Sequence, residues 1–143
     1  MLTLSIVDDD DLVCRSLKRI VSSLGYRVET FASAEDFLCS DCLDCCDCLI
    51  LDVRMPGING LELQKQLLSR NANFPIIFIT SQSDEATKEQ ALAAGAVDYI
   101  LKPFKAEQLL SAIRKALGMA GETAEIPVTF NLADKFADFV NAE

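Results

Sequence analysis

The stretch LSIVDDDDL, residues 4–12, joins a short apolar run directly to four consecutive carboxylates. Similar apolar runs rich in β-branched residues recur along the chain, and each is followed by a segment with a helical pattern. Several of these runs are apolar at consecutive positions, which is typical of parallel strands covered on both faces. The predicted strands are residues 4–7, 27–30, 48–51, 75–79 and 98–101.

The segments between these strands have the 3.6-residue period of helices. The first helix carries an apolar stripe from Leu12 to Leu24, and Gly25 stands where a left-handed C-terminal cap belongs. Three further helices are expected after N-caps: residues 34–39 after Ser33, 60–70 after Asn59 and 85–94 after Asp84. Gly95 is expected to end the helix over 85–94, and a fifth helix is expected to end at 117, before Gly118. This alternation predicts an α/β fold of the doubly wound (βα)5 type with a five-stranded parallel sheet.

Composition and charge restrict the class of protein. The chain has 143 residues, 50% of them hydrophobic, which favours one domain with a short appendage. Thirteen basic and 22 acidic residues give a net charge of −9, which argues against direct binding of nucleic acid or anionic lipid. No apolar run reaches membrane-spanning length, so we expect a cytoplasmic protein without membrane association. Histidine is absent, which excludes catalytic triads that need histidine and metal sites that have histidine ligands.

Polar side chains stand at the carboxyl ends of four predicted strands: Asp8 and Asp9, Asp52, Thr80 and Lys102. Ligands of open α/β sheets bind at this edge, so these side chains should converge. Neighbouring carboxylates cannot all stay ionised without compensation, which a hard divalent cation such as Mg²⁺ supplies through oxygen ligands. Lys102 and Thr80 suit phosphoryl oxygens, and Asp52 remains as the nucleophile for an in-line phosphoryl transfer.

The segments IVDDD, LILDVRMPGINGLEL, IIFITSQ, GAVDYILKPF and EQLLSAIRKAL resemble a bacterial response-regulator receiver domain over residues 1–118. VETFASAEDFL and DVRMPG are most similar to FixJ/NarL-type receivers. The resemblance implies a flavodoxin-like, CheY-like fold with strand order 2-1-3-4-5. It also implies a switch, not an enzyme with a separate substrate, which catalyses only its own phosphorylation and dephosphorylation.

The same resemblance assigns roles at the site. Asp52 would accept a phosphoryl group from a histidine kinase or a phosphotransfer protein. Mg²⁺, for which Mn²⁺ could substitute, would be held by Asp9 and Asp52, by Asp8 through water, and by the backbone carbonyl of Arg54. Arg54 and Gln82 stand where receivers adjust phosphoryl lifetime, and the Arg54 guanidinium would either shield the acyl phosphate or bind it.

The family's switch is expected to involve two further movements. Thr80 would move toward the new phosphoryl group, and Tyr99 would turn inward into the vacated space. The surface of the fourth helix, the fifth strand and the fifth helix would then contact an output domain or a second copy of the chain. The Lys102–Pro103 bond is a candidate cis peptide.

The aspartates and the site as a whole also have other possible interpretations. Asp10 and Asp11 are expected only to cap a helix, and Asp8 and Asp9 taken alone could do the same. A phosphatase of the haloacid-dehalogenase type needs a second aspartate where Arg54 stands. A flavodoxin-like FMN site needs a phosphate-binding loop where the chain has DDDDLVC.

A cysteine-rich segment and the C-terminal residues lie outside this scheme. Five thiols in this segment are a candidate zinc, iron–sulfur or redox-sensitive cluster: Cys39, Cys42, Cys45, Cys46 and Cys48. Such a cluster would make the protein a redox- or metal-responsive regulator, which is the alternative function. The default prediction is that the segment is an unstructured loop. Residues 119–143 are expected to form a linker and a short amphipathic helix. That helix would pack on the receiver, pair two chains or begin an output domain, in which case the chain would be the receiver fragment of a DNA-binding transcription factor.

Overall fold

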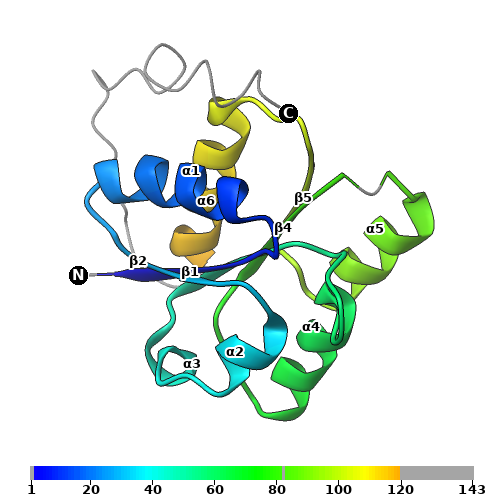
Figure 1. Cartoon of the computed structure of the whole chain (residues 1–143). Coiled ribbons are helices and arrows are strands. Elements are labelled where there is room, and N and C mark those ends of the chain that lie inside the picture. Colours follow the sequence, from blue (N-terminus) through cyan, green and yellow to red (C-terminus); the bar gives the residue numbers. More distant parts are fainter. Residues whose placement is uncertain (1, 82, 120–143) are drawn as a thin grey trace.

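The computed structural model describes residues 2–81 and 83–119, which form one parallel sheet with helices on both faces (Figure 1). The strands are β1 (Thr3–Val7), β2 (Arg27–Phe31), β3 (Cys48–Leu51), β4 (Ile76–Thr80) and β5 (Asp98–Leu101). Their order is β2-β1-β3-β4-β5, and every neighbouring pair is parallel. The predicted fold and strand order are confirmed, with strand ends that differ from the prediction by one residue at most.

The helices are α1 (Asp11–Ser23), α2 (Ala34–Leu38), α3 (Cys42–Cys45), α4 (Gly60–Ser69), α5 (Glu85–Ala93) and α6 (Ala106–Met119). Figure 1 shows α1 and α6 on one face of the sheet and α2 to α5 on the other. The core is accordingly divided into two clusters, because successive strand residues point to opposite faces. Ile50 of β3 packs with α1 and α6, whereas its neighbours Leu49 and Leu51 pack with α2, α4 and α5.

The predicted helix starts are confirmed by their hydrogen bonds. The Ser33 hydroxyl accepts from the Asp36 N–H at 3.1 Å, and the Asp84 carboxylate accepts from the Ala86 N–H at 3.2 Å. Asn59 forms a reciprocal capping box with Glu62, which fixes the start of α4 just after the β3–α4 loop.

Two of the three predicted glycine stops are confirmed. Gly25 and Gly95 have φ angles of 96° and 107°, the left-handed conformation that ends a helix. The stop expected before Gly118 is wrong, because α6 continues through Gly118 to Met119. Glycine lowers helix stability but does not itself end a helix. The linker and helix predicted for residues 119–143 lie, apart from Met119, outside the described residues.

The cysteine-rich segment is not an unstructured loop, so that default prediction is wrong. Cys42–Cys45 forms the single helical turn α3, and Cys39 is the C-cap of α2. Cys42 and Leu43 pack against the core cluster on the α2–α4 face. A turn of four residues is decided by such tertiary contacts, since it is too short to be stable alone. Among the helices of the described part of the chain, none has the length and apolar character needed to cross a membrane.

Candidate functional site

The charged residues at the carboxyl edge of the sheet continue its hydrogen-bond ladder. The Asp8 N–H donates to the last carbonyl of β2 at 3.1 Å, and the Asp52 N–H donates to the last carbonyl of β1 at 3.0 Å. The Lys102 N–H donates to the last carbonyl of β4 at 2.8 Å. The sheet therefore fixes the backbone of each residue at the point where its side chain leaves the strand.

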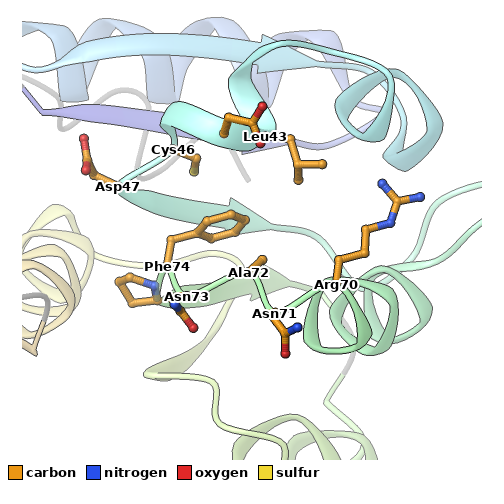
Figure 2. A pocket seen from close by; sticks show the side chains of 10 residues that line it. Leu43, Cys46, Asp47, Arg70, Asn71, Ala72, Asn73 and Phe74 are labelled. Atoms are coloured by element: carbon orange, nitrogen blue, oxygen red, sulfur yellow. The ribbon is translucent and has the colours of Figure 1, made fainter.

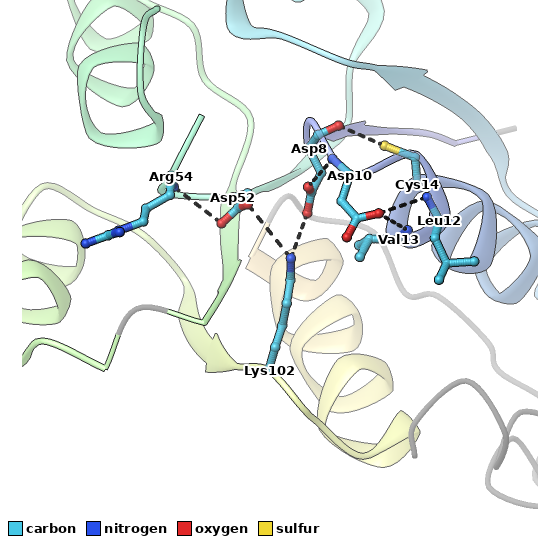
Figure 3. A network of polar contacts seen from close by, with 8 residues as sticks. All are labelled: Asp8, Asp10, Leu12, Val13, Cys14, Asp52, Arg54 and Lys102. Atoms are coloured by element: carbon cyan, nitrogen blue, oxygen red, sulfur yellow. Dashed lines mark hydrogen bonds and ion pairs between the residues drawn. The ribbon is translucent and has the colours of Figure 1, made fainter. Parts of the chain in front are cut away.

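These side chains meet as the sequence predicts (Figure 3). The Lys102 ammonium lies 3.0 Å from Oδ2 of Asp8 and 3.8 Å from Oδ2 of Asp52. The Thr80 hydroxyl, which is fully buried, donates a hydrogen bond to the Asp52 carboxylate. The side chains of Lys102 and Asp52 are each only 9% exposed, so water screens this contact weakly. A positive charge between the carboxylates is thus already present as Lys102.

One ammonium does not fully compensate the two buried carboxylates. Burial raises the pKa of Asp8 despite its hydrogen bond from the Asp10 N–H and the nearby Lys102 charge. Burial, followed by the charge of Asp8, raises the pKa of Asp52 to about 6, although Lys102 and the Thr80 hydroxyl oppose this rise. A further cation at this edge would therefore stabilise the ionised carboxylates.

The donor set fits a hard divalent cation. Asp8, Asp9 and Asp52 each offer a carboxylate oxygen, and these oxygens all lie within 4.8 Å of one another. Asp9 is exposed while the other two are buried, so a bound ion would have protein oxygens on one side and water on the other. Mg²⁺ is normally bound in this way, by a few carboxylates and several waters.

Arg54 approaches this site through its backbone. Its N–H donates to Oδ1 of Asp52 at 3.4 Å, whereas its exposed guanidinium points away from Asp52 (Figure 3). The role of its carbonyl as a metal ligand stays a prediction, as does its role in phosphoryl lifetime. Gln82, the other residue expected to adjust that lifetime, lies outside the described residues.

Asp10 caps helix α1 as expected, whereas Asp11 does not cap it but lies in its first turn. Oδ1 of Asp10 accepts from the N–H groups of Leu12 and Val13 at 3.0 and 3.4 Å, so Asp10 is the N-cap of α1. Asp11 pairs with Arg15 at 3.0 Å on an exposed face. Such an exposed pair contributes little to stability.

The two expected switch residues lie beside this cluster. Tyr99 is 7% exposed and its ring centroid lies 6.1 Å from that of Phe78. The tyrosine ring is thus buried, and Thr80 already contacts Asp52, in this structure. The Lys102–Pro103 peptide bond is cis, as predicted.

Three further features of the site were not predicted. The Cys14 thiol of α1 donates to the Asp8 carbonyl at 3.2 Å. Gly60 packs so closely on the β3–α4 loop that an added Cβ would overlap the Asp52 carbonyl oxygen. An open pocket of about 570 Å³ beside Asp9 is lined by residues that include Arg54 and Thr87. Only Gly60 left a signal in the sequence, as a glycine directly after the predicted N-cap.

The cysteines do not form the candidate five-residue metal cluster. Within residues 2–81 and 83–119, the only group of three or more potential metal ligands is the aspartate group described above. Cys46 and Cys48 are buried, whereas Cys39 and Cys45 are exposed. The geometry therefore does not support a zinc or iron–sulfur site built from these thiols.

Comparisons with known proteins agree with this geometry. The family model of the response regulator receiver domain matches residues 4–114. The response regulator protein TodT of Pseudomonas putida is 48% identical over 115 residues, which cover 80% of this chain and 51% of TodT. The transcriptional regulatory protein FixJ of Azorhizobium caulinodans is 38% identical over 121 residues, 85% of this chain and 57% of FixJ. The chain spans about half the length of these curated relatives.

Solved structures show the same relationship. The response regulator StyR has a TM-score of 0.77 and 40% identity, covering 83% of this chain and 60% of that chain. The crystal structure of FixJ-N has a TM-score of 0.74 and 36% identity, covering 82% of this chain and 94% of that chain. The fold, the acidic edge of the sheet and these matches lead to one conclusion. The chain belongs to the response regulator receiver domain family and is a signalling domain of two-component systems.

Proposed function

We propose that Asp52 is the phosphoacceptor of this domain and receives its phosphoryl group from a histidine kinase or a histidine phosphotransfer protein. One observation carries the proposal: the Asp52 carboxylate is buried at a strand end with Lys102 at 3.8 Å and the Thr80 hydroxyl bonded to it. Asp9 and Arg54, which both lie next to the Asp52 carboxylate, line an open pocket, so the surroundings of this buried carboxylate are accessible to a ligand.

The transfer follows from these positions. An oxygen of Asp52 forms a bond to phosphorus while the phosphorus–nitrogen bond of the donor phosphohistidine breaks, and the imidazole nitrogen keeps the electron pair. Lys102 compensates negative charge on the phosphoryl oxygens, and Thr80 donates a hydrogen bond to one of them. Phosphoryl transfer needs mainly this positioning and charge compensation from the protein.

Asp9 and Asp52 directly, and Asp8 through water, would hold a Mg²⁺ or Mn²⁺ ion. The bound ion would supply positive charge against the transferring phosphoryl group. The raised pKa values of Asp8 and Asp52 support this assignment, because they indicate carboxylates with too little compensating charge. In this role the domain catalyses only its own phosphorylation and dephosphorylation.

The resulting acyl phosphate would act on the surface formed by α5, β5 and α6. Phosphorylation adds charge and acceptor oxygens beside Thr80 and Tyr99, enough to favour one arrangement of the neighbouring loop. Leu92 of α5 and Leu101 of β5 are 39% and 43% exposed, which supports a contact surface there. We propose an output domain or a second copy of the chain as the partner, in the cytoplasm. The name of the relative FixJ, a transcriptional regulatory protein, supports transcriptional control as the output.

A phosphodonor assay tests the assignment. The chain is incubated with acetyl phosphate and Mg²⁺, and its intact mass and its size in solution are measured. We expect one added phosphoryl group in the wild type and in the control Asp36→Asn, an exposed carboxylate on α2, and none in Asp52→Asn. Phosphorylation that persists in Asp52→Asn would refute the choice of phosphoacceptor.

A further inference from the structure

The cysteine thiols differ sharply in their access to solvent. Cys46 and Cys48 are buried, and burial raises the pKa of Cys46 to about 11 and that of Cys48 as well. The Cys46 thiol also donates to the Cys48 carbonyl at 3.2 Å. Cys14, on α1, is buried in the same core cluster as Cys48, on the other face of the sheet from Cys46. These three thiols are therefore protected from reaction, since the thiolate is the reactive form and needs access to its partner.

Two of the remaining thiols are direct neighbours. Cys42 and Cys45 lie three residues apart on α3, a spacing that places side chains on the same face of a helix. Burial raises the pKa of the Cys42 thiol, and the charge of Glu29 and the neighbouring Cys45 thiol add to this rise. The Cys45 sulfur also lies 3.8 Å from the carbonyl oxygen of Cys42 and is exposed.

The backbone spacing of this pair suits a disulfide. Helical geometry places Cα atoms three residues apart at a distance of about 5 Å, inside the range of about 4.4–6.8 Å found in disulfides. The Cβ atoms must approach each other by a further 1 to 2 Å, roughly, for the bond to form. Helix α3 permits this movement, because it is a single turn without a side-chain N-cap and its residues are at most partly buried.

The chain after α3 is held firmly, so the movement would remain local. The Asp47 N–H donates to the Thr3 carbonyl at 2.8 Å, and the Thr3 N–H donates to Oδ2 of Asp47 at 2.8 Å. This reciprocal pair fixes the register of β3 against β1. Closing a ring over residues 42–45 therefore does not require the strand that carries Asp52 to shift.

We propose that Cys42 and Cys45 form a redox-active dithiol, which a low-molecular-weight disulfide converts reversibly to an intramolecular disulfide. The exposed thiolate of Cys45 attacks one sulfur of the disulfide, which releases one thiolate and leaves a mixed disulfide on Cys45. The thiolate of Cys42 then attacks the Cys45 sulfur and releases the second thiolate. The reagent gains two electrons, the chain loses two, and the two protons end on the released thiols.

Oxidation would change a pocket far from the phosphoacceptor. Leu43, between the two cysteines, lines a pocket of about 480 Å³ together with Arg70 and Phe74 (Figure 2). Its lining residues precede β3 and β4, so the pocket lies at the opposite end of these strands from Asp52. The inference is thus independent of the proposed phosphorylation and can fail or succeed without it.

The test uses the full chain, reduced and then incubated with oxidised glutathione. We expect an intact mass lower by two hydrogens, and the loss should be reversed by dithiothreitol. Cleavage before aspartate separates Cys42 from Cys45, because Asp44 lies between them. The linked product should therefore contain peptides 41–43 and 44–46 joined through sulfur.

Variants decide the pairing. Cys42→Ser and Cys45→Ser should each lose the disulfide, while the matched control Cys39→Ser, an exposed cysteine on the neighbouring C-cap, should keep it. A disulfide that survives in Cys45→Ser would assign the bond to another cysteine and overturn the proposal. Stable addition of glutathione without ring closure, or no reaction, would overturn it as well.

Discussion

Replacing Asp52 by asparagine is expected to stabilise the metal-free domain. The carboxyl pKa rises from 3.8 to about 6 in the folded chain, first because Asp52 is buried and second because Asp8 is charged. Each unit of pKa corresponds to about 1.4 kcal/mol, so the ionised carboxylate costs the folded state about 3 kcal/mol near neutral pH. The amide carries no charge but packs imperfectly against Lys102, and we therefore expect Asp52→Asn to raise the free energy of unfolding by about 1–3 kcal/mol.

The gain should depend on pH in a defined direction. A carboxyl group with a raised folded-state pKa binds its proton more tightly in the folded chain, so folding stability falls as pH rises from about 4 to about 6 and stays level above. Asp52→Asn removes this loss. The difference in stability between the variant and the wild type should thus be small at about pH 4 and largest at about pH 7.

Urea unfolding followed by circular dichroism, in a buffer with a chelator, measures this difference. Glu89→Gln, an exposed carboxylate on α5, is the matched control and should change stability little at either pH. Addition of Mg²⁺ should stabilise the wild type, because a ligand that binds only the folded state shifts the unfolding equilibrium, and should stabilise Asp52→Asn less. An Asp52→Asn variant no more stable than the wild type in chelator at about pH 7 would refute the electrostatic reasoning.

Two further substitutions test the surroundings of this carboxylate. Lys102→Met removes the ammonium that pairs with Asp8 at 3.0 Å. We expect calorimetry to show tighter Mg²⁺ binding, and phosphorylation by acetyl phosphate to be slower by a factor of about ten or more. If neither the Mg²⁺ affinity nor the phosphorylation rate changes, the role given to Lys102 is contradicted. Gly60→Ala places a Cβ against the Asp52 carbonyl oxygen and should lower the free energy of unfolding by about 1–3 kcal/mol. Gly118→Ala, where an added Cβ meets nothing within 4 Å, should instead raise it by about 0.5–1 kcal/mol, and equal effects at the two glycines would show that the close contact does not matter.

The sequence predicted the fold well because the signals for this fold are local. Apolar strands, polar residues at their ends, and caps such as Ser33 and Asn59 each act within a few residues. The meeting of the site residues was predictable for a related reason. In a parallel sheet all strands end at one edge, so residues as far apart as Asp8 and Lys102 could be placed together before the structure was known.

What could not be predicted depends on contacts between distant segments. Helix α3 forms because Leu43 packs against the core, and the four residues of this turn carry no sequence pattern that predicts a helix. The hydrogen bond from the Cys14 thiol to the Asp8 carbonyl joins residues only six apart, but it depends on the turn between β1 and α1, which no sequence pattern specified. The sequence pointed to a metal ion as the positive charge among the carboxylates, whereas the structure shows that Lys102 already occupies part of that role.

The backbone bonds that hold Asp8, Asp52 and Lys102 to the strand ends have a consequence for divergence within the family. Strand spacing in a parallel sheet is nearly constant, at about 4.8 Å, so the three charges inherit their separation from the sheet and not from the loops that follow. We therefore expect substitutions in those loops to alter the lifetime of a phosphoryl group while the three charged groups stay in place. If so, the duration of the signal and the position of the charges can change independently as the sequence diverges.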